Sequence, residues 1–291
     1  MNNYIIITNR GRGDRLGAQF THYICLIIYA SFYNYYIEYN EELYPNSIFT
    51  IALKKFVDNY NKDKIKGKLV KFIFSDDWCK LNSFVVLNIK TDLVSYFKKN
   101  LFQIINHVDE LALIRKYNIP FDIDKTILVH LRLDDVNFTN RIDYNGSISF
   151  DYIKDKINKE NLNYDDEISY YRSQNITSNF NLYNCQAPLS DCKIENVLSI
   201  LKRKYENYKI IIVTSPIGNV TLPYDIIRSE DPSVDLFYLT KAKIIILSRS
   251  TFALGVLYLT NAEEVWLPKW GYLGSLGLES IYSNINFNYF N

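Results

Sequence analysis

One apolar run constrains the fold of this chain more than any other segment. Residues 126–130 read TILVH, Leu131 and Arg132 follow directly, and Asp135 lies three residues beyond Arg132. A β-branched and aliphatic run of this kind predicts a buried strand of an α/β protein. Ligands of such proteins collect where the strands end, so a guanidinium at this position is well placed to hold an anion. A phosphate-facing site is one interpretation, and an Arg132–Asp135 ion pair that closes a loop is the other.

Strand-like and helix-like segments alternate along the rest of the chain. Short apolar runs predict strands at 4–8, 68–74, 83–89, 209–213, 244–247 and 264–267, and longer segments predict helices at 19–34, 93–117, 194–205, 235–241 and 253–259. Such alternation implies mostly parallel sheets that helices cover on both faces. Pro120 and its flanking turn residues divide the chain into expected domains at 1–120 and 121–291.

The net charge of the chain is too small for general electrostatic attraction to polyanions. The 33 Lys and Arg residues nearly balance 32 Asp and Glu residues, which leaves a net charge of +1. An anionic ligand must therefore be met locally, and no nucleic-acid partner is expected. No segment is apolar for long enough to span a bilayer, and the amino terminus has no basic leader with a cleavage site. These features predict a soluble protein in the cytoplasm.

Two further polar segments lie between a predicted strand and a predicted helix. Residues 9–19 read NRGRGDRLGAQ, and residues 248–252 read SRSTF. Backbone N–H groups and hydroxyls at the start of a helix attract phosphate oxygens, and Arg12 and Arg15 in the first segment favour an anion. A tight turn would also explain the glycines, and ordinary helix capping would explain Ser250 and Thr251. Together with Arg132, these segments could converge on one diphosphate.

Three short motifs resemble those of a known enzyme superfamily. The segments Arg15-Leu16-Gly17-Ala18-Gln19-Phe20, His130-x-Arg132-x-x-Asp135 and Ser250-Thr251-Phe252 follow the same order, in the same strand contexts, as three motifs of the α1,2-, α1,6- and protein O-fucosyltransferases. The chain resembles a distant member of that superfamily. The motifs are spread over the whole chain, whereas segments 40–64 and 143–190 show no correspondence.

The resemblance implies an α/β fold of the GT-B type. Two Rossmann-like domains would hold a nucleotide-sugar donor in the cleft between them, with the first domain on the acceptor side. Arg132 would contact the donor diphosphate, Asp135 would orient Arg132 or His130, and Gly17 would permit close approach of the backbone. The residues expected to bind the donor are Arg12, Arg15, Gly17, His130, Asp135, Arg249, Ser250, Thr251 and Phe252.

The implied reaction is inverting transfer of a sugar to a hydroxyl of a glycan. A carboxylate would remove the proton from that hydroxyl, while Arg132 offsets the charge that grows on the departing nucleoside diphosphate. Asp14 in the glycine loop, and Asp76 or Asp77 after a predicted strand, are the candidate bases. A surface or turn role would explain each of these acids as well.

Three functional hypotheses are consistent with the motifs. GDP-fucose is the first. Leu133 stands where the family motif has a second arginine, and Ala18 where it has an asparagine, so a UDP-sugar donor, as in a xylosyltransferase, is an alternative. A non-catalytic carbohydrate- or nucleotide-binding protein of the same fold is the second alternative. The expected partners are therefore a GDP- or UDP-linked sugar and a glycan acceptor.

One acidic pair bears on metal dependence. Asp122-Ile123-Asp124 matches the Asp-x-Asp pattern with which other glycosyltransferases hold a divalent ion on the donor phosphates. The pair precedes a predicted strand and lies beside Pro120, which favours a turn. His22 and His107 lie in helical apolar patterns, where a structural role is expected. The sequence thus predicts no metal and no other cofactor.

Overall fold

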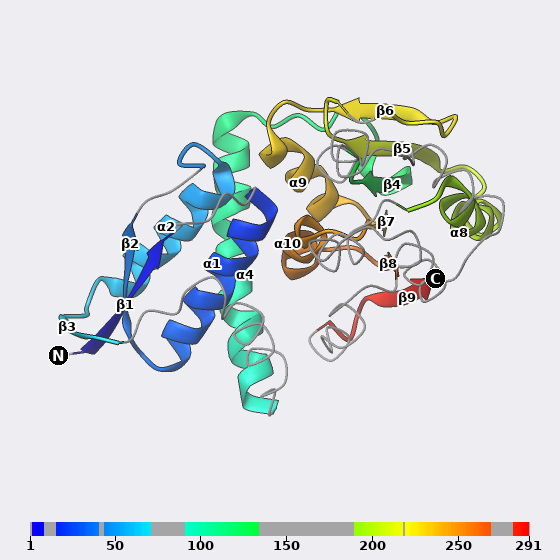
Figure 1. Cartoon of the computed structure of the whole chain (residues 1–291). Helices are drawn as coiled ribbons and strands as arrows, with labels where there is room; N and C mark the ends of the chain where they lie inside the picture. Colours follow the sequence, from blue (N-terminus) through cyan, green and yellow to red (C-terminus); the bar gives the residue numbers. More distant parts are fainter. Residues whose placement is uncertain are drawn as a thin grey trace, which may run out of the picture. The chain divides into compact units, whose positions relative to one another are not determined.

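Two compact units make up the part of the chain that the structure, a computed structural model, describes (Figure 1). The described residues are 2–8, 16–40, 44–70, 91–133, 189–217, 219–268 and 282–290. The first unit contains the described residues up to Asn118, together with Leu254–Leu259, Tyr282 and Ser283. The other described residues form the second unit. The division into contiguous domains at 1–120 and 121–291 remains a prediction.

A parallel three-stranded sheet lies in the first unit. Its strands are β1 (Asn2–Thr8), β2 (Tyr36–Asn40) and β3 (Lys66–Leu69), in the order β2-β1-β3. The helix α1 (Leu16–Phe32) connects β1 to β2, α2 (Ile48–Asn61) connects β2 to β3, and α4 (Thr91–Arg115) packs on α2. This is the strand–helix alternation that the sequence predicts.

Helix α1 is buried along almost its whole length. Its side chains pack with those of α10 (Thr251–Leu259), whose residues Leu254–Leu259 belong to the same unit. The Tyr258 hydroxyl lies 3.7 Å from the Cys25 sulfur, and the Tyr258 ring lies 5.8 Å from that of Phe97 on α4. His22, also on α1, is 2% exposed, which confirms its predicted structural position.

A parallel six-stranded sheet lies in the second unit. In sheet order its strands are β6 (Asp225–Arg228), β5 (Lys209–Thr214), β4 (Thr126–Leu131), β7 (Ile244–Ile246), β8 (Glu264–Pro268) and β9 (Asn286–Phe290). Counted from β4, this is the order 3-2-1-4-5-6 of Rossmann-like nucleotide-binding sheets. The order reverses between β4 and β7. Ligands of open α/β sheets bind outside the carboxyl ends of the strands at such a reversal.

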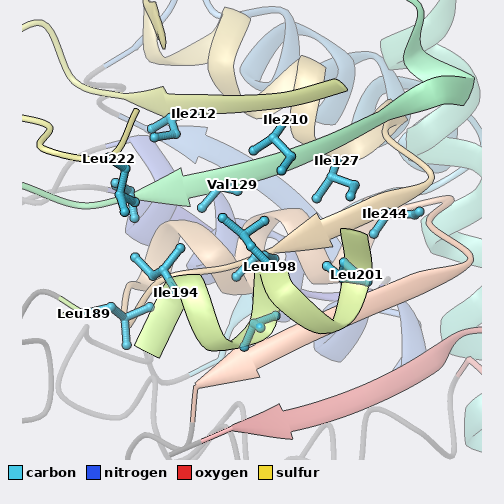
Figure 2. Packing of buried hydrophobic residues seen from close by; sticks show 13 residues of the cluster. Ile127, Val129, Leu189, Ile194, Leu198, Leu201, Ile210, Ile212, Leu222 and Ile244 are labelled. Carbon is cyan, nitrogen blue, oxygen red and sulfur yellow. The ribbon is translucent and has the colours of Figure 1, made fainter. Parts of the chain in front are cut away.

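Helix α8 (Asp191–Lys204) covers one face of this sheet (Figure 2). Its apolar side chains pack against alternate residues of β4, β5 and β7. The cluster comprises Ile127, Val129, Leu131, Leu189, Ile194, Val197, Leu198, Leu201, Ile210, Ile212, Leu222, Ile244 and Ile246. Because side chains alternate along a strand, Leu128 and His130 of β4 face the opposite side.

The α/β class and the parallel sheets are confirmed, and several predicted boundaries are corrected. Helix α8 begins at Asp191 rather than 194, because the Ser190 hydroxyl accepts from the Lys193 N–H at 3.4 Å. Helix α9 (Pro232–Lys241) begins three residues before the predicted 235, because Asp231 caps it at 2.8 Å from Ser233 N. The predicted strand at 83–89 lies outside the described residues.

Candidate functional site

The carboxyl end of β4 brings His130 to the reversal point of the second sheet. His130 pairs in register with Val213 of β5, and β7 flanks β4 on the other side. The imidazole lies on the face opposite α8 and is only 8% exposed. Two side chains from beyond β7 meet it there. The Ser248 hydroxyl oxygen lies 2.8 Å from His130 Nδ1, and the Phe252 ring stacks on the imidazole with centroids 5.0 Å apart and 30° between the planes.

Burial controls the charge of this histidine. Loss of hydration, together with the positive charge of Arg132, lowers the pKa of His130 to about 3. The imidazole is therefore neutral at physiological pH. A neutral imidazole carries one N–H donor and one acceptor nitrogen, so it can position a polar ligand but does not add a positive charge.

Arg132 directly follows β4 and is half-buried. On an extended chain, every second side chain lies on the same face of the sheet. Arg132 therefore lies on the same face as His130, opposite α8. Leu133, the next residue, packs against the apolar cluster beneath α8. A partly buried leucine thus occupies, in this chain, the position that corresponds to the second arginine of the motif.

The segment after β7 supplies a buried cation and a helix cap. The Arg249 side chain is 1% exposed. The Ser250 hydroxyl accepts from Phe252 N at 3.1 Å, and the Ser250 carbonyl accepts from Ala253 N at 3.0 Å. The capping interpretation of Ser250 is therefore confirmed. A hydroxyl that accepts an N–H keeps its own proton, so Ser250 can still donate to a ligand. Thr251 is half-buried at the first position of α10.

The other predicted site residues are placed in part. Gly17 lies in the first turn of α1, where its carbonyl accepts from the Thr21 hydroxyl at 2.8 Å. Its predicted approach to a ligand remains a prediction. The remaining candidates lie outside the described residues. They are Arg12, Asp14, Arg15, Asp76, Asp77 and Asp135.

One buried acid was missed by the sequence interpretation. Asp235 lies in the first turn of α9, which begins at the same edge of the sheet because it follows β6. Burial, together with the charge of Asp231, raises the pKa of Asp235 to about 8. Among the described residues, no group donates to its Oδ1 atom. Perturbed carboxyls of this kind cluster at functional sites. Its signal was an acid between Val234 and Leu236, directly before an apolar and aromatic run in the same helix.

The candidate metal pair forms a turn. Asp122 Oδ1 accepts from Asp124 N at 3.1 Å and caps the short helix η2 (Ile123–Lys125). The described segments bring no three His, Cys, Asp or Glu side chains together in a way that could hold a metal ion. The turn that the sequence favoured is confirmed, whereas cofactor use remains a prediction.

Comparisons with known proteins assign no family to this chain. No protein-family model matches the chain, and no curated protein matches its sequence. None of the described helices combines the length and apolar character needed to cross a membrane.

Proposed function

We propose that this chain is an inverting glycosyltransferase that moves a sugar from a nucleotide-sugar donor to a hydroxyl of a glycan, with GDP-fucose as the first donor to test. The meeting of His130 with Ser248 and Phe252 carries the proposal. His130 and Ser248 are 118 positions apart in the sequence, yet they form a buried hydrogen bond beside the strand-order reversal of a Rossmann-like sheet. This contact joins segments that contain two of the three fucosyltransferase-like motifs.

Charge supports a phosphate-containing ligand at this edge. Arg132 follows β4 and Arg249 follows β7, so an arginine comes after each of the two strands that flank the reversal point. A planar guanidinium matches phosphate oxygens, and it would stabilise the charge that grows on the leaving nucleoside diphosphate. The proposal includes the GT-B arrangement, with the second unit as the donor domain. Asp14, Asp76 and Asp77 remain the proposed candidates for the base.

A UDP-sugar is the second donor to test. Leu133 packs into the α8 cluster, so its position cannot supply the second arginine of the fucosyltransferase motif. The site therefore lacks one cation through which that family would recognise its donor, and the resemblance favours GDP less strongly than a complete motif would. A UDP-linked pentose, as used by a xylosyltransferase, tests this alternative.

Nucleotide binding and turnover separate the hypotheses. We expect GDP, UDP or CDP at a hundred times its dissociation constant to stabilise the protein by about 2.7 kcal/mol in a thermal-shift assay. Release of the nucleoside diphosphate from GDP-fucose or UDP-xylose then measures turnover with a glycan mixture as acceptor. Binding without turnover would support the non-catalytic alternative. If no nucleotide stabilises the protein, the proposal is wrong.

Arg132→Ala should reduce transfer strongly and leave the fold intact. The variant lacks the preorganised cation that would stabilise the leaving group, so we expect kcat to fall about 10²- to 10³-fold. Urea unfolding should remain cooperative. Arg203→Ala is the matched control, because Arg203 is an exposed arginine on α8 whose Nε donates to the Ser199 carbonyl at 3.1 Å. Wild-type turnover in Arg132→Ala would reject the assigned role.

A further inference from the structure

The proton between Ser248 and His130 can be located by counting donors and acceptors. The Ser248 oxygen and His130 Nδ1 are 2.8 Å apart, and the two residues are 3% and 8% exposed. Within the described part of the chain, neither the Ser248 hydroxyl nor the other ring nitrogen, Nε2, forms another hydrogen bond. One proton therefore lies between these two atoms, and it belongs either to the hydroxyl or to Nδ1.

Only one of the two arrangements satisfies both buried groups. If Nδ1–H donated to the hydroxyl oxygen, the proton of Ser248 itself would have no acceptor in a buried position, which is unfavourable. If the Ser248 hydroxyl donates to Nδ1, the hydroxyl proton and the Nδ1 lone pair are satisfied together, and only the Nε2–H is left for a ligand; Nε2 is not among the fully buried atoms of the described residues that lack a partner. The ring is neutral, since burial and Arg132 lower the pKa of His130 to about 3. Its single proton then resides on Nε2.

We propose that Ser248 is a positioning residue that fixes His130 as the Nε2–H tautomer, so that His130 donates a hydrogen bond to an anionic oxygen of the ligand. Nε2 lies on the side of the ring away from Ser248, and the stacked Phe252 ring limits rotation of the imidazole. Arg132, on the same face of the chain, supplies the charge, and His130 supplies a fixed neutral donor. The tautomer is independent of the proposed function. The identity of the ligand, a nucleoside diphosphate, rests on that function.

Nitrogen NMR of the imidazoles tests the tautomer without any ligand. The chain has three histidines, so selective ¹⁵N-histidine labelling gives few signals, and His130→Gln assigns those of residue 130. We expect Nε2 of His130 to carry the proton near pH 7 and Nδ1 to show the downfield resonance of an unprotonated, hydrogen-bonded nitrogen. A proton on Nδ1 in the wild-type protein would overturn the proposal.

Two variants of Ser248 test the positioning role. Ser248→Ala should move the Nδ1 resonance further downfield, because that nitrogen loses its donor, and should weaken GDP and pyrophosphate binding in calorimetry about tenfold. Ser248→Thr retains a hydroxyl and should restore both. Ser199→Ala is the control, since it removes an exposed serine hydroxyl that bonds only within α8. If Ser248→Ala changes neither the resonance nor the affinity, Ser248 does not position His130.

The tautomer of His130 and the transfer activity can be tested separately. An Nε2–H tautomer together with no binding of GDP, UDP or pyrophosphate would retain the Ser248–His130 pair but overturn the ligand assignment and the glycosyltransferase. Transfer activity together with an Nδ1–H tautomer would support the enzyme and overturn the role of Ser248.

Discussion

Gly255 in α10 should accept alanine and make the protein more stable. A Cβ atom at this position would lie 3.4 Å from Phe20 Cδ1, 3.6 Å from the Thr21 hydroxyl and 3.7 Å from the Gly17 carbonyl oxygen, which are ordinary van der Waals distances. The methyl group would therefore fill space without displacing α1. Glycine inside a helix costs roughly 0.5–1 kcal/mol relative to alanine. We expect Gly255→Ala to raise the free energy of unfolding by about 1 kcal/mol.

Urea unfolding followed by circular dichroism measures this change. The midpoint should rise while the m-value stays constant, since the surface exposed on unfolding is nearly unchanged. Gly255→Val is the contrasting variant. Its two additional methyl groups would collide with the atoms of α1 that a single Cβ atom only contacts. Overpacking of this kind costs roughly 1–3 kcal/mol. If alanine lowers the midpoint as valine does, the described packing between α1 and α10 is refuted.

Two buried acids predict opposite dependences of stability on pH. Burial raises the pKa of Asp235 to about 8, so its stabilising contribution is present below its unfolded value of about 4 and lost as the pH rises through 8. The urea midpoint of Asp235→Asn should therefore fall less than that of the wild type between these values, and parallel curves would contradict the assignment. Burial alone would raise the pKa of Glu264, but hydrogen bonds from Lys204, Tyr205 and Trp266 outweigh burial and hold the pKa below its usual value. Its contribution is present above the unfolded pKa and lost on acidification, so Glu264→Gln should cost about 1–3 kcal/mol at pH 7 and approach the wild type in acid. An equal cost at every pH would refute this account.

The sequence was most informative where apolar side chains are continuous. The runs at β4, β5, β7 and β8 are buried on both faces, so they appear as strands without any knowledge of their neighbours. Strands β2, β6 and β9 were missed. Each lies at the edge of its sheet and has intermediate or exposed residues, so its pattern is weak even though its backbone is fully extended. Helix α2 was also missed, and it lies in a segment that contains none of the three motifs.

The sequence identifies several residues of the candidate site, but it does not predict which of them are in contact. A histidine and an arginine after a buried strand indicate the carboxyl edge of a sheet, and SRSTF before a helix indicates the same edge. The strand order places β4 beside β7, and this order depends on the packing of the whole unit rather than on any local pattern. The Ser248–His130 hydrogen bond follows from that neighbourhood. Asp235 was missed because its burial depends on what packs around α9.

Crystal structures with GDP and with UDP bound would show whether residues around the β4–β7 reversal hold a diphosphate. We expect diphosphate oxygens within hydrogen-bonding distance of the Arg132 guanidinium and of His130 Nε2, beside the first turn of α10. A nucleotide bound elsewhere, or an Arg132 side chain directed away from the diphosphate, would contradict this expectation.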